Sequence, residues 1–147
     1  MALPDADRLD AWRSFLTAHA AMNKMLSRAL ETDHGLLLTW YEILDALHDD
    51  DEGSVRFNEL AEKVMAHPSS LSRQIDKLEE LRYVARERAT LDDGRSLLVV
   101  LTREGRDTWK RASTTYYRIV RRVFTNSLTE TDVVALNRIF GKVLEAD

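Results

Sequence analysis

One stretch of the chain, residues 57–101, constrains the fold more than any other part of the sequence. Apolar residues at helical spacing predict a short helix over about 58–65 and a second over 68–81, with a tight turn between them. Two strands are then predicted over 83–88 and 96–101, joined by an Asp-Asp-Gly turn. Helix, turn, helix and hairpin in this order predict a winged helix-turn-helix lobe.

Amphipathic helices are predicted on both sides of this lobe. They cover about 6–31, 40–47, 102–124 and the residues from 129 onward. Thr39 and Thr102 are the expected caps of two of them, and Thr129 with Asp132 forms a capping box for the last. The first helix and the last two carry more apolar surface than one compact lobe would bury.

That excess of apolar surface predicts association. A two-fold dimer in which both termini interleave is favoured, and an N-terminal helix folded back on its own chain is the alternative. The expected fold class is therefore mainly α with a small β-hairpin wing. Residues 1–34 and 103–147 would form a helical dimerisation region, and residues 35–102 would form the winged helix-turn-helix domain.

The charge is unevenly distributed around a net charge of −4 at pH 7. Residues 1–55 hold 4 Lys or Arg against 11 Asp or Glu, whereas residues 56–106 hold 10 against 9. A positive face is therefore expected only beyond the first third of the chain. The absence of cysteine excludes disulfides and thiol-based redox sensing. With no secretory signal or membrane-length apolar run, we expect a cytoplasmic protein that does not contact membranes.

The outward face of the helix over 68–81 has the composition of a DNA-reading surface. Opposite its apolar stripe stand the polar residues Ser69, Ser70, Arg73, Gln74 and Lys77. Free N–H groups at the helix N-terminus favour a phosphate beside the two serines. The Arg73 guanidinium can form two hydrogen bonds to one guanine, and Gln74 can pair with adenine or with a phosphate. For any one of these residues, an ordinary solvent-exposed helix face is the default interpretation. Three features together favour DNA binding: serine hydroxyls at the N-terminus, long hydrogen-bond donors one turn later, and acidic residues kept off this face.

The hairpin adds an arginine at its tip. Arg95 comes two residues after Asp93, on a loop narrow enough for a minor groove, where A·T tracts deepen the negative potential. Asp93 would orient the guanidinium from behind. A plain turn with a local ion pair, worth little at a surface, is the alternative for these two residues taken alone.

In this order, the motifs resemble those of the MarR family of bacterial transcriptional regulators. The resemblance lies in residues 58–61, 71–79, 93–95 and 101–105 and extends over nearly the whole chain. It implies a homodimer that binds a pseudo-palindromic operator, with recognition helices roughly 34 Å apart. It also implies that Ser72 and Arg73 contact the operator and that Arg95 is the wing-tip arginine. Two residues depart from the family pattern: Arg82 replaces a helix-ending glycine, and Gly94 replaces a basic wing residue.

The same resemblance implies a small aromatic or phenolic anion as an effector. Five side chains are candidates for its site: Trp12, Phe15, His19, Trp40 and Tyr116. Aromatic residues at helical spacing are more often ordinary core, and that interpretation stays open for each. Without cysteine, the peroxide-sensing mechanism of the family is excluded.

No nucleophile–base pair, phosphate loop or ligand-like histidine spacing occurs in the sequence, so we expect neither catalysis nor a metal or other cofactor. The sequence therefore predicts a homodimeric, sequence-specific, ligand-responsive repressor of transcription. The alternative is a winged-helix dimer that acts as a protein-interaction or scaffold module without specific DNA binding, which the acidic N-terminal third favours slightly.

Overall fold

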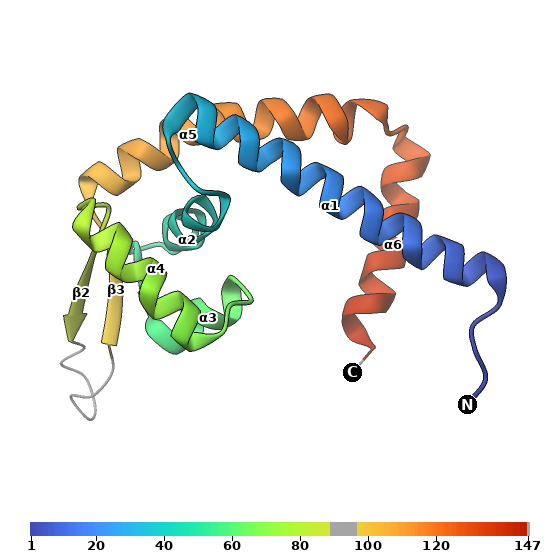
Figure 1. The fold of residues 1–147 in the computed structure, drawn as a ribbon, viewed down its shortest axis with the longest axis horizontal. Coiled ribbons are helices and arrows are strands. Elements are labelled where there is room, and N and C mark those ends of the chain that lie inside the picture. The colour runs from blue at the N-terminus through green and yellow to red at the C-terminus, as the bar shows by residue number, and fades with distance from the viewer. Residues whose placement is uncertain (89–96, 147) are drawn as a thin grey trace. The chain divides into compact units, whose positions relative to one another are not determined.

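The computed structural model describes residues 1–88 and 97–146. Its elements are α1 (Ala6–His34), α2 (Leu38–Asp49), β1 (Ser54–Arg56), α3 (Phe57–Lys63), α4 (Pro68–Glu80), β2 (Val84–Arg88), β3 (Leu97–Leu101), α5 (Arg103–Val123), the 3-10 helix η1 (Thr125–Ser127) and α6 (Glu130–Glu145). The predicted fold class, mainly α with a small β-hairpin wing, is confirmed. The β2–β3 hairpin lies beside α4 (Figure 1).

The chain divides into two compact units, which we describe separately. The terminal unit comprises Met1–Met25 and Tyr117–Asp147, and the winged unit comprises Leu26–Tyr116. The assignment of the terminal helices to dimerisation stays a prediction.

The winged unit is built around one apolar core. Its fully buried side chains come from α1 to α5, from the turn between α1 and α2, and from β2 and β3. The largest are Leu30, Leu36, Tyr41, Leu44, Leu47, Leu60, Leu71, Ile75, Leu78, Val84 and Val99. Three of them, Leu71, Ile75 and Leu78, lie on α4 with the spacing of a single helix face. One face of α4 is therefore fixed against the core, and the opposite face is left to solvent.

The sheet contains a third strand that the sequence analysis missed. β1 pairs antiparallel with β3, with Ser54 opposite Val100, and the strand order is β1-β3-β2. The Asp50 carboxylate accepts hydrogen bonds from the N–H groups of Glu52 at 3.0 Å and Ser54 at 3.2 Å, which closes the turn before β1. A strand of three residues is too short to show the alternation that predicts a strand, and its partner is distant in the sequence.

Two of the predicted helix caps are confirmed. The Thr102 hydroxyl accepts a hydrogen bond from the Gly105 N–H at 3.0 Å at the start of α5. Thr129 and Asp132 form the predicted capping box at the start of α6. The Thr129 backbone N–H, which donates to the Asp132 carboxylate at 2.9 Å, lowers the pKa of Asp132 below its ordinary value.

The predicted cap of α2 is wrong. Thr39 lies inside the first turn, because α2 begins at Leu38 and follows Leu37, which makes no side-chain cap hydrogen bond. Gly35, with φ +60°, reverses the chain between α1 and α2, and the next residue, Leu36, is buried. Helix α2 therefore begins one residue before Thr39 and without a side-chain cap.

Arg82 adopts the left-handed conformation that the family pattern fills with glycine. Its φ is 65°, and its N–H donates to the Glu79 carbonyl at 2.9 Å while the Tyr83 N–H donates to the Leu78 carbonyl at 2.9 Å. These two bonds close α4 in the usual left-handed termination. A side chain costs about 1 kcal/mol in this conformation. The Thr102 hydroxyl, which donates to the Arg82 carbonyl at 2.7 Å, helps to hold it there.

The terminal unit leaves much of its apolar surface exposed. No residue of α6 is fully buried, and Val143 on this helix is 64% exposed. Phe15 of α1 and Phe140 of α6 have ring centroids 6.0 Å apart, so α1 does contact α6 of its own chain. Both rings nevertheless remain exposed, as does Trp12. Contact within the chain therefore does not cover this surface.

Candidate nucleic-acid interface

Helix α4 carries most of the residues predicted to contact DNA. Of these, Ser69, Arg73 and Lys77 are exposed, and Ser70, Ser72 and Gln74 are half-buried. The core contacts of Leu71, Ile75 and Leu78 fix which face of the helix looks outward. Donor groups therefore stand on a rigid element, as a reading surface requires.

The N-terminus of α4 is capped by His67, a residue to which the sequence analysis gave no role. Its Nδ1 accepts a hydrogen bond from the Ser69 N–H at 3.3 Å and lies 2.8 Å from the Ser69 hydroxyl. Pro68 occupies the first helical position, where its missing N–H costs nothing. Histidine is not among the preferred capping residues, so no sequence signal identifies it. The contact fixes the Ser69 hydroxyl at the start of the helix.

Arg86 of β2 joins the sheet to α4. Its Nη2 lies 2.7 Å from Asp76 Oδ1, and its Nη1 lies 3.1 Å from Glu79 Oε1. The same Nη2 donates to the Ser72 carbonyl at 3.1 Å. The Arg86 side chain is 22% exposed, but the side chains of Asp76 and Glu79 are 59% and 44% exposed, so solvent still screens the carboxylate ends of both contacts. The single positive charge of Arg86 offsets one of the two negative charges next to the outward face, an arrangement that periodicity alone does not reveal.

Glu80, the remaining acidic residue of α4, lies close to the outward face, which was predicted to be free of acidic residues. Glu80 Oε2 is 3.8 Å from Lys77 Nζ, and both side chains are more than 60% exposed. An exposed pair at this distance contributes little. Lys77 therefore remains accessible to a phosphate.

Gln74 is held from inside the winged unit. The indole Nε1 of Trp40, on α2, donates to Gln74 Oε1 at 2.6 Å. Trp40 packs against the core of the unit. The structure thus brings together a residue predicted to bind DNA and one predicted to bind an effector.

The predicted wing-tip residues Asp93 and Arg95 lie outside the described residues. β2 and β3 are described up to the pair formed by Arg88 and Leu97. The roles given to Asp93 and Arg95 stay predictions.

The five residues predicted to line an effector site are divided between the two units. In the terminal unit, Trp12 stacks on Phe15 at 6.0 Å and Phe15 on His19 at 6.3 Å between ring centroids. In the winged unit, Tyr116 stacks on Tyr41 at 4.5 Å, and Trp40 is bonded to Gln74. The three residues of α1 therefore form one continuous row of rings.

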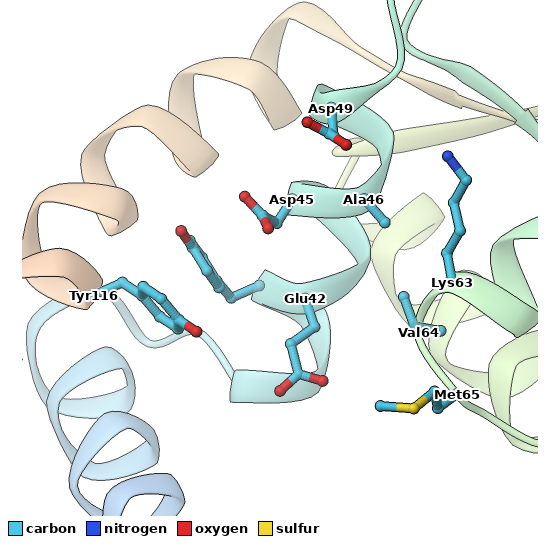
Figure 2. Close-up of a pocket in the computed structure, with 9 residues that line it drawn as sticks. Glu42, Asp45, Ala46, Asp49, Lys63, Val64, Met65 and Tyr116 are labelled. Atoms are coloured by element: carbon cyan, nitrogen blue, oxygen red, sulfur yellow. The ribbon is translucent and has the colours of Figure 1, made fainter. Parts of the chain in front are cut away.

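The winged unit also contains a cavity of about 560 Å³. It is lined by Tyr41, Glu42, Asp45, Ala46, Asp49, Lys63, Val64, Met65 and Tyr116. Figure 2 shows Glu42, Asp45 and Asp49 along α2, with Tyr116 on one side of that helix and Lys63 on the other. Of the predicted effector residues, only Tyr116 lines it. Three carboxylates against one ammonium disfavour an anion in this cavity.

None of the helices in residues 1–88 and 97–146 is both long and apolar enough to cross a bilayer. Over the same residues, no group of three or more His, Cys, Asp or Glu side chains is placed to hold a metal ion.

Comparison with known proteins finds similar winged helices. A family model described as a winged helix DNA-binding domain matches residues 39–120. The transcriptional regulator SarZ of Staphylococcus epidermidis is 35% identical over 75 residues, which is 51% of this chain and 49% of SarZ. The chain thus matches about half the length of that relative.

Two solved structures match nearly the whole chain. AbsC and Sco3205, MarR family transcriptional regulators of Streptomyces coelicolor, are 29% and 28% identical to it, each with a TM-score of 0.91. Each match covers 99% of this chain, and 97% of AbsC or 91% of Sco3205. The Sco3205 structure contains DNA.

Proposed function

This chain belongs to the MarR family of winged-helix transcriptional regulators, and from that premise we propose that it is a homodimeric repressor which binds a pseudo-palindromic operator. The outward face of α4 carries the proposal. An arginine and a lysine stand on this face, serine hydroxyls lie at its N-terminus, and Arg86 pairs with Asp76 and Glu79 and offsets one of their two negative charges. Such a face offers hydrogen-bond donors to base edges and phosphates.

The proposed roles follow from the chemistry of each side chain. Arg73 reads a guanine through its bidentate fork, and Ser72 lies beside it at the operator. Ser69, Ser70 and Lys77 bind phosphates, the two serines with help from the free N–H groups of the first turn. At the wing, Asp93 orients Arg95 for the minor groove.

Arg73→Ala is expected to weaken operator binding by about 1–3 kcal/mol and to relax the preference for the selected sequence, because the guanine contact is lost. Arg95→Ala is expected to weaken binding with a smaller loss of discrimination. The measurement is fluorescence anisotropy with an operator selected from randomised DNA and with a scrambled duplex, each at two salt concentrations.

The matched control for both variants is Arg28→Ala, which removes the same charge from an exposed position on α1. It is expected to bind both duplexes as the parent does. If Arg73→Ala and Arg95→Ala also behaved as the parent, the roles given to the recognition helix and the wing would be wrong. A parent that selects no sequence at all would favour the scaffold function instead.

The proposal extends to an effector, a small aromatic or phenolic anion that releases the protein from DNA. The row of rings formed by Trp12, Phe15 and His19 supports it, because exposed rings offer stacking faces and His19 offers a donor to a carboxylate. Trp40 and Tyr116 remain candidates from the winged unit. The acidic cavity beside α2 is unsuited to an anion.

Titration of hydroxybenzoates into the protein–operator complex is expected to release the DNA. Trp12→Ala should raise the concentration needed for half-release by roughly 3- to 10-fold, the value of one stacking contact. Met65→Ala, in the acidic cavity, should not change it. The effector proposal fails if no anion of the series releases DNA at millimolar concentration.

A further inference from the structure

We propose that Trp40 makes Gln74 a specificity-determining residue, by turning its carboxamide so that the NH₂ group, and not the oxygen, is offered to the operator. The inference rests on the proposed function, because it requires that α4 reads DNA. It assigns to Gln74 a preference for guanine over adenine, and to Trp40 the part of a positioning residue.

The identity of the bonded atom follows from the chemistry of tryptophan. The Trp40 Nε1–H lies 2.6 Å from Gln74 Oε1. An indole nitrogen only donates, so the Gln74 atom that faces it must be the acceptor, the amide oxygen. The usual ambiguity between the two ends of a glutamine amide is therefore removed at this position.

Trp40 is a firmly placed donor. It belongs to α2, and its ring packs against the core of the winged unit. Gln74 lies on α4 between the buried stripe and the exposed face, next to Arg73 and one turn after Ser70, and it is half-buried. The oxygen and the nitrogen of the amide lie on opposite sides of its terminal carbon. With the oxygen directed toward α2, the NH₂ group is directed away from Trp40.

This orientation changes what Gln74 can read. A free glutamine pairs with adenine by accepting from N6 and donating to N7. With one lone pair of its oxygen bonded to Trp40 and that oxygen turned toward α2, Gln74 is a weaker acceptor toward DNA and presents mainly its two N–H donors. Guanine presents two acceptors, O6 and N7, whereas adenine presents N7 beside an amino group that is itself a donor. The fixed amide therefore favours guanine, and the sequence-based pairing of Gln74 with adenine is replaced.

The decisive variant is Trp40→Phe, which keeps an aromatic ring against the core, removes the N–H donor and loses one of the two fused rings of the indole. Sequences are selected from randomised DNA with the parent, Trp40→Phe, Gln74→Ala and the double variant, and affinities are then measured for guanine and adenine duplexes. We expect the guanine preference at one base pair of each half-site to fall by about tenfold in Trp40→Phe, the size of one good base contact. Affinity for random DNA should not change.

Two comparisons make the test specific. Trp109→Phe is the matched control, because the Trp109 indole also donates within the winged unit, to Asp45 Oδ1 at 2.9 Å, and its loss should not alter the selected bases. In a Gln74→Ala background, Trp40→Phe should have no further effect on the guanine preference, because Trp40 acts only through Gln74.

Three outcomes would overturn the inference. Trp40→Phe and Gln74→Ala could select the same bases as the parent, Trp109→Phe could shift the preference equally, or both test variants could lose affinity uniformly, as a phosphate contact would. In each case the parent still selects an operator, so the proposed function stands. A parent that selects no sequence would instead contradict the proposed function itself.

Discussion

Gly105→Ala is expected to destabilise the protein by about 2–3 kcal/mol, although the substitution adds only one methyl group. A Cβ at this position would lie 2.0 Å from the Tyr83 carbonyl oxygen and 2.9 Å from Leu101 Cδ1. The Tyr83 carbonyl also accepts a hydrogen bond from the Thr102 N–H at 3.1 Å, where the strands meet α5. Backbone atoms cannot move aside as the end of a flexible side chain can. The added methyl group must therefore strain this junction.

Gly141→Ala is the matched control, because no atom lies within 4 Å of a Cβ built there. In the middle of α6, alanine should stabilise the helix by about 0.5–1 kcal/mol relative to glycine. Urea unfolding monitored by circular dichroism measures both variants. Equal stability of the two variants would contradict the proposed contact between Gly105 and Tyr83.

Gly105 also shows how a family motif acquires a physical meaning. In the sequence, Gly105 is the last residue of the 101–105 motif that resembles the family, and the motif gives no physical reason for a glycine there. In the structure Gly105 is buried, and only glycine, which has no Cβ, lets α5 pass this close to the Tyr83 carbonyl. The neighbouring Thr102 cap, by contrast, was predictable from local chemistry, because a threonine before a helix has a known partner in the first turn.

The elements that the sequence predicts are those whose signal is local. The stripe of Leu71, Ile75 and Leu78 identified α4, and Thr129 with Asp132 identified the start of α6. β1 was missed because it exists only through its pairing with β3. The prediction that Thr39 caps α2 is wrong, because α2 begins at Leu38 and its N-terminus has no side-chain cap that a sequence pattern could reveal.

The same distinction holds at the candidate interface. Residue types and spacing indicate which side chains face outward on α4, but not what holds them. His67 caps the helix without a recognised capping signal, and Arg86 reaches α4 from another element. The hydrogen bond from Trp40 to Gln74 joins α2 to α4 through two residues that are 34 positions apart in the sequence. Such contacts require the tertiary structure, and they decide which donors and charges the outward face presents.

Val143→Asp is expected to dissociate the proposed dimer and to lower operator affinity by roughly 10²- to 10⁴-fold. Val143 is 64% exposed in the single chain, on a helix with no fully buried residue, so the substitution should leave the protomer folded. In a two-fold interface the same residue would bury an unpaired carboxylate in each subunit, which is strongly unfavourable. Without the dimer, each subunit would bind its half-site independently and weakly, because the second binding step would no longer be intramolecular. Sedimentation velocity and anisotropy with the selected operator measure both effects.

Asn137→Asp is the control, because it adds the same charge to an exposed polar position of α6 and should change neither the sedimentation nor the affinity. Circular dichroism establishes that both variants keep the helical content of the parent. If Val143→Asp sedimented and bound as Asn137→Asp does, α6 would not lie in the interface. The exposed apolar residues of α1, Trp12, Phe15 and Leu16, would then be the next candidates for the two-fold contact.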